Sequence, residues 1–106
     1  MKYYRHGELS FHPLEVLPLS LEKVPARKDF VLARGEATGH THRLVFEEGD
    51  VDIFMDQEGN YILNVIREAQ LTHPEHKPIT LSPGIYMQKI EQEYDPFEEQ
   101  RRMVLD

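Results

Sequence analysis

Residues 44–66 read LVFEEGDVDIFMDQEGNYILNVI and consist of three short apolar segments separated by turns at 48–50 and 56–60. The turns are rich in glycine, aspartate and asparagine, the residue types that most often reverse a chain. The segments between them carry many β-branched and aromatic side chains and are too short for helices. The stretch therefore predicts three strands, the first two joined as a hairpin: 44–46, 51–54 and 61–66.

The rest of the chain follows the same pattern, with seven prolines and six glycines spread between short apolar segments. Further strands are predicted at residues 30–33, 69–73, 78–81 and 85–94. The tail is ambiguous, because residues 95–98 carry the signals of a helix N-terminus whereas 103–105 are typical of an edge strand. Short connections between antiparallel strands indicate a sandwich or a barrel. We expect one all-β domain, residues 1–106, built as a small antiparallel β-barrel or a two-sheet sandwich.

Composition excludes several classes of protein. Nineteen acidic against twelve basic side chains give a formal net charge of −7, which repels a phosphate backbone. The chain contains no cysteine, so any metal site must be built from nitrogen and oxygen ligands. No segment approaches the roughly 20 apolar residues of a membrane span. We therefore expect a cytoplasmic protein that binds neither nucleic acid nor a membrane.

Four of the six histidines lie in two tight pairs, His40 with His42 and His73 with His76. Neutral imidazole is the commonest protein ligand for transition metals. Because side chains alternate faces along a strand, the first pair shares a face with Leu44, which is expected to be interior. Spacing alone leaves open whether both rings of the second pair reach the ion. We predict a divalent transition-metal cofactor: zinc, iron, nickel or manganese.

Residues 35–47, GEATGHTHRLVFE, resemble the first motif of the cupins, in which a glycine precedes a His-x-His pair and a glutamate follows it. The two histidines and the glutamate of that motif are metal ligands in cupins. The resemblance therefore implies that His40, His42 and Glu47 bind the metal, and that the fold is cupin-like, of jelly-roll type. Glu47 falls on the opposite strand face from His42 unless the strand bulges or turns.

The turn at Pro83 and Gly84 is loosely similar to the second cupin motif. Cupins place their last histidine ligand just after that turn, where residues 85–88 of this chain are Ile, Tyr, Met and Gln. A histidine ligand from this half of the chain must therefore be His73 or His76, which precede the turn.

Two classes of function fit this pattern. The first is an accessory or binding module that uses a histidine-rich metal site, and the second is a metal-dependent enzyme acting on a small molecule, such as a cupin-like oxygenase, isomerase or hydrolase. No catalytic residue can be named. A flat strand at 85–94 would leave an exposed edge for a second copy to cover, which is compatible with a homodimer. A protein partner or a small-molecule ligand fits equally well.

The other polar candidates are interpreted as structural. His6 and His12 show no partner pattern, and Glu75 is expected to be a solvated loop carboxylate. Tyr86 and Tyr94 are expected to be half-buried packing residues with exposed hydroxyls.

Overall fold

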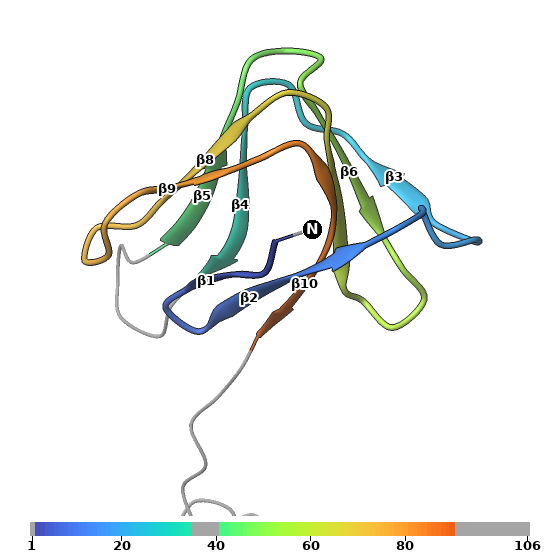
Figure 1. The fold of residues 1–106 in the computed structure, drawn as a ribbon, viewed down its shortest axis with the longest axis horizontal. Helices are drawn as coiled ribbons and strands as arrows, with labels where there is room; N and C mark the ends of the chain where they lie inside the picture. Colours follow the sequence, from blue (N-terminus) through green and yellow to red (C-terminus); the bar gives the residue numbers. More distant parts are fainter. Residues whose placement is uncertain (1, 35–40, 91–106) are drawn as a thin grey trace, which may run out of the picture.

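The computed structural model of the protein describes residues 2–34 and 41–90, which Figure 1 shows as two layers of β-strand. Ten strands make up these layers: β1 (Tyr4–His6), β2 (Leu9–Leu14), β3 (Glu22–Val24), β4 (Asp29–Arg34), β5 (Thr41–Val45), β6 (Val51–Met55), β7 (Tyr61–Val65), β8 (Ala69–Thr72), β9 (Ile79–Leu81) and β10 (Gly84–Ile90). The expected helical turn at 95–98 and strand at 103–105 lie outside the described residues. None of the described residues belongs to a helix with the length and apolarity needed to cross a membrane.

The strands form two separate antiparallel sheets. The larger has the order β1-β2-β10-β7-β6-β3, and the smaller has the order β4-β5-β8-β9. Among the described residues no strand pairing joins one sheet to the other, so the sheets are not closed into a barrel. The all-β expectation is confirmed, and of its two alternatives the structure forms the two-sheet sandwich.

The hairpin expected between residues 44–46 and 51–54 is wrong. β5 pairs with β4 and β8, whereas β6 pairs with β3 and β7 in the other sheet. The segment between them is a corner: Phe46 N donates to Lys28 O at 2.8 Å and Asp50 N donates to Glu47 O at 2.9 Å, which carries the chain across to the second layer. The hairpin of this region is β6–β7, in which Val51 lies opposite Val65.

The second difference concerns β10, expected as an exposed edge. It lies between β2 and β7 in the larger sheet and pairs with both. β10 is therefore an inner strand paired with β7 over residues 84–87 and with β2 over residues 85–90, and an unpaired edge along the whole of β10 no longer supports a homodimer. Association of two copies stays a prediction without that argument.

The core lies between the two sheets and follows the alternation of side chains along each strand. In β5, His42 and Leu44 are buried while Arg43 and Val45 are exposed, as the sequence predicted. The core cluster combines both layers: Leu9, Phe11, Ile53, Leu63, Val65 and Tyr86 from the larger sheet, and Leu32, Leu44, Leu71 and Leu81 from the smaller. Full burial of each large apolar side chain contributes about 1.5–3 kcal/mol. His42 therefore occupies a core position among residues that hold the sandwich together.

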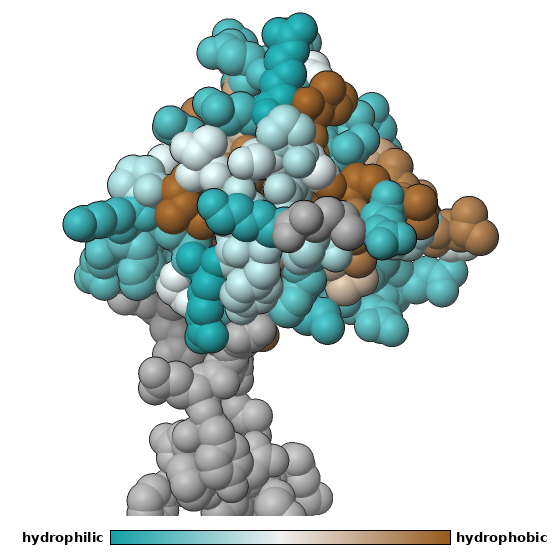
Figure 2. Space-filling view, in the orientation of Figure 1, coloured by the Kyte–Doolittle hydropathy of each residue, from teal (hydrophilic) through white to brown (hydrophobic). Residues whose placement is uncertain are grey.

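The outer surface is mainly hydrophilic, as Figure 2 shows for one face. Apolar residues on this face gather toward the side where β3 lies in Figure 1. The connection from β2 to β3 carries the exposed side chains of Val16, Leu17 and Leu19.

Candidate metal centre

Three separate parts of the chain bring imidazole rings together at one end of the sandwich. His6 ends β1, His42 lies on the inner face of β5, and His73 and His76 belong to the connection between β8 and β9. The ring centroids of His42 and His73 are 4.4 Å apart, those of His73 and His76 are 4.5 Å apart, and those of His6 and His42 are 5.2 Å apart. These four rings, together with Glu8, are called the histidine cluster below.

The turn between β1 and β2 supports the cluster from one side. His6 pairs with Leu9, so Gly7 and Glu8 form a two-residue turn. Gly7 has φ +61°, a left-handed conformation that glycine adopts readily. A Cβ atom at Gly7 would lie 2.8 Å from His76 Nε2 and 3.1 Å from His42 Cε1. The glycine therefore serves both the turn and the close approach of two imidazoles.

Hydrogen bonds fix which nitrogens of the two buried rings carry protons. His6 Nε2 lies 2.9 Å from Lys77 O, and because a carbonyl oxygen only accepts, His6 Nε2 is the donor. Burial lowers the pKa of His6, so the ring is neutral and its Nδ1 is an acceptor. His6 Nδ1 lies 3.1 Å from His42 Nδ1, which must therefore donate to it. The remaining nitrogen of a neutral His42, Nε2, then carries a lone pair.

That lone pair faces a carboxylate. His42 Nε2 is 3.2 Å from Glu8 Oε2, the His42 side chain is fully buried, and its Nε2 has no hydrogen-bond partner. Burial lowers the pKa of His42 by more than neighbouring Glu8 raises it. Burial raises the pKa of Glu8, but a hydrogen bond from its own backbone amide and the attraction of the His42 ring when that ring is protonated lower it overall. At neutral pH two acceptors therefore face each other, an arrangement that is costly unless a cation lies between them.

The second histidine pair is close but differently oriented. Glu75 N donates to His73 Nδ1 at 3.0 Å, which leaves the proton of a neutral His73 ring on Nε2. The His76 side chain is exposed. Within residues 2–34 and 41–90, no group of three or more histidine, aspartate or glutamate side chains is arranged to hold a metal ion. The structure thus presents one converged pair of donor atoms, with further imidazoles beside it.

Comparison with known proteins identifies the family of the chain. Residues 5–91 match the model of a domain of unknown function, DUF8820. The chain belongs to this family. The matched DUF8820 segment contains His6, Glu8, His42, His73 and His76, so the whole histidine cluster lies inside it. No curated protein and no solved structure matches the chain.

Of the ligands predicted from the sequence, the structure brings His42, His73 and His76 together. His40 lies outside the described residues. Glu47 is exposed just beyond the end of β5, and the carboxylate beside His42 is Glu8 instead.

Sequence reasoning missed two members of the cluster, His6 and Glu8. His6 was interpreted as structural because it showed no partner pattern in the sequence. The signal available was the His-Gly-Glu order, in which a glycine turn places a carboxylate directly after an inward-facing histidine.

Proposed function

We propose that this DUF8820 chain is a small accessory or binding module that holds a divalent transition-metal ion at the histidine cluster. His42 Nε2 and Glu8 Oε2 are the primary ligands. The observation that carries this proposal is the buried, unpartnered lone pair of His42 directed at an ionised carboxylate 3.2 Å away. An imidazole nitrogen and a carboxylate oxygen together are a donor set that zinc, iron, nickel and manganese accept.

The dimensions of the pair support a shared cation. Metal–nitrogen bonds of about 2.0–2.1 Å and metal–oxygen bonds of about 2.0–2.2 Å allow one ion to contact two atoms that are 3.2 Å apart. His6 acts as the orienting neighbour, because its hydrogen bond to His42 Nδ1 holds the Nε2 lone pair toward Glu8. His73 and His76 are further candidate ligands, with ring centroids 4.4 and 6.0 Å from that of His42.

A metal-dependent enzyme of cupin-like type is the alternative within the same proposal. Catalysis on a small molecule requires a pocket beside the metal. The cavity of about 260 Å³ in the described structure is lined by residues outside the histidine cluster. That cavity therefore gives no support to catalysis at the cluster, and the binding or accessory role is the function proposed.

Metal binding is tested on the full chain after the metal has been removed with a chelator. Elemental analysis after incubation with zinc and desalting should give about one zinc per chain. Free zinc at 100 times its dissociation constant should stabilise the protein by about 2.7 kcal/mol in thermal unfolding.

The Glu8→Gln variant removes the negative ligand while keeping the size of the side chain. We expect it to bind zinc at least about 100-fold more weakly, because loss of a ligand exceeds the 10- to 100-fold cost of losing an outer partner. Asp56→Asn is the matched control, since Asp56 lies in another turn, and it should bind zinc like the original chain. Equal zinc affinity of the Glu8→Gln variant and the original chain would refute the assignment of this site, as would no binding of zinc, iron, nickel or manganese by either.

A further inference from the structure

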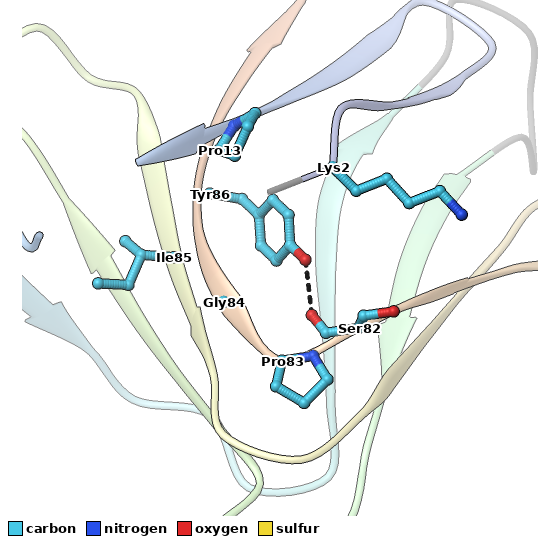
Figure 3. Close-up of a pocket in the computed structure, with 7 residues that line it drawn as sticks. All are labelled: Lys2, Pro13, Ser82, Pro83, Gly84, Ile85 and Tyr86. Carbon is cyan, nitrogen blue, oxygen red and sulfur yellow. Dashed lines mark hydrogen bonds between the residues drawn. The ribbon is translucent and has the colours of Figure 1, made fainter. Parts of the chain in front are cut away.

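A second feature lies where the chain passes from β9 in the smaller sheet to β10 in the larger. A cavity of about 260 Å³ opens there between the N-terminal segment and the β9–β10 connection. Figure 3 shows the residues that line it: Lys2, Pro13, Ser82, Pro83, Gly84, Ile85 and Tyr86. The cavity shares no lining residue with the histidine cluster.

One wall of the cavity is held in place by Tyr86. Its side chain is 3% exposed and its hydroxyl donates to Ser82 O at 2.6 Å, the contact dashed in Figure 3. The expectation of an exposed hydroxyl at this position was wrong. Burial raises the pKa of Tyr86, so the hydroxyl keeps its proton at neutral pH. A Cβ at Gly84 would lie 3.2 Å from the Tyr86 hydroxyl, so the glycine makes room for this contact.

Two hydrogen-bond donors at this cavity have capacity for a ligand. Ser82 Oγ accepts from Tyr4 OH at 3.0 Å and Ser82 N donates to Tyr4 OH at 3.3 Å. Within the described part of the chain, the Tyr4 hydroxyl is the one side-chain hydrogen-bond partner of Ser82 Oγ, so this hydroxyl has capacity for a further hydrogen bond. Lys2 Nζ lies 5.2 Å from the centroid of the Tyr4 ring, and its ammonium makes no ion pair with a described carboxylate. Figure 3 shows the Lys2 ammonium and the Ser82 hydroxyl on the same side of Tyr86.

We infer that this cavity binds a small organic monocarboxylate with a compact apolar body. The carboxylate would accept from Ser82 Oγ and pair with Lys2, while Pro13 and Pro83 offer apolar surface to the rest of the molecule. A volume of about 260 Å³ lies below the ~300–1,000 Å³ typical of sites for drug-sized ligands, which restricts the ligand to fragment size. Among anions a monoanion fits best, because the repulsion from a chain with a net charge of −7 increases with the charge of the ligand.

The test adds benzoate, or its neutral isostere benzamide, to the isotope-labelled full chain in the presence of chelator. Binding is measured from the chemical shifts of the backbone amides. The chelator removes metal, so that carboxylate binding to the histidine cluster does not contribute. We expect benzoate to shift the amides of Lys2, Ser82, Gly84 and Tyr86, and benzamide to bind at least about tenfold more weakly. The Lys2→Met variant should lose benzoate affinity by a similar factor, and Lys89→Met, which changes an exposed lysine outside the cavity, should leave it unchanged.

Ser82→Ala supplies a second measurement that leaves Lys2 unchanged, and it should weaken benzoate binding several-fold. Benzamide binding as tightly as benzoate would overturn the proposal, because the site would then not recognise the charge. Unchanged benzoate affinity in both Lys2→Met and Ser82→Ala would overturn it too, as would benzoate shifts confined to residues outside the cavity.

Discussion

The turns β1–β2 and β6–β7 both contain a carboxylate and a glycine with positive φ, and they use the carboxylate in opposite ways. Asp56 Oδ1 accepts from Glu58 N at 2.9 Å and from Asn60 N at 2.8 Å, and Oδ2 lies 3.4 Å from Asn60 Nδ2. These hydrogen bonds, above all those of Asn60, lower the pKa of Asp56. Glu8 Oε2 instead faces the unprotonated Nε2 of buried His42.

The comparison distinguishes the Asp56 carboxylate, whose hydrogen bonds stabilise its own turn, from the Glu8 carboxylate, which is available to bind a ligand. The donors around Asp56 come from its own turn, so that turn is complete without any added ion. The Glu8 carboxylate faces a second acceptor supplied by β5, so the protein itself leaves the interaction unfinished. A cation completes it, which is why we assign metal binding to the β1–β2 turn and a purely structural role to the β6–β7 turn.

The largest expected difference between the two turns comes from their glycines. Gly59 has φ +86° and a Cβ at this position would meet no neighbouring atom within 4 Å, so Gly59→Ala should cost only the backbone strain, about 1–2 kcal/mol. Gly7→Ala adds a contact of 3.1 Å with Cε1 of buried His42, beside one of 2.8 Å with Nε2 of exposed His76 that a movement of that side chain can relieve, and should cost about 1–3 kcal/mol more in urea unfolding. Zinc binding, measured on both variants, should weaken only for Gly7→Ala. Equal losses of stability and zinc affinity in the two variants would contradict the packing of His76 against Gly7.

The fold was predictable from the sequence to the extent that it depends on local alternation. Strands at 30–33, 51–54 and 61–66 were identified because β-branched and aromatic residues mark half-buried strands regardless of their partners. The passage of the chain from β5 in one sheet to β6 in the other was not predicted, because Gly49 suits a corner between sheets as well as a hairpin turn. Which sheet a strand joins depends on contacts distant in the sequence.

The candidate site, too, was predictable only where it depends on local alternation. Alternation placed His42 on the inner face of β5 correctly, because that inference needs only the strand itself. His6 is 36 residues away from His42 in sequence, and only the pairing of β1 with β2 and the packing of the two sheets bring the rings together. The pattern within one segment therefore identified His42, but no local pattern could identify His6 as its hydrogen-bond partner.

The free energy of unfolding should also depend on pH through the two buried histidines of the cluster. Because burial lowers the pKa of His6 and His42, the unfolded chain, with histidine pKa values of about 6.5, binds protons that the folded chain does not. The free energy of unfolding of the metal-free protein should therefore be unaffected by these rings above about pH 7.5, and should decrease as the pH falls through 6.5. Urea unfolding between pH 7.5 and 5.5 measures this slope, and His42→Gln should reduce it. A free energy that increases toward pH 5.5 would show that the two rings gain protons on folding, and a constant one would show that folding leaves their pKa values unchanged.

The smallest expected effect is also the most specific, because the same chemical change should have opposite signs at the two turns. Without metal, Glu8→Gln gives the side chain an amide N–H that can donate to His42 Nε2, which should stabilise the protein by about 0.5–1.5 kcal/mol. Asp56→Asn places an amide N–H among donors and removes the charge, which should destabilise it by about 0.5–1.5 kcal/mol. Urea unfolding of both variants in chelator measures the two changes. If Glu8→Gln also destabilised the metal-free protein, Glu8 and His42 would already share a proton, and the lone pair available to a metal would not exist.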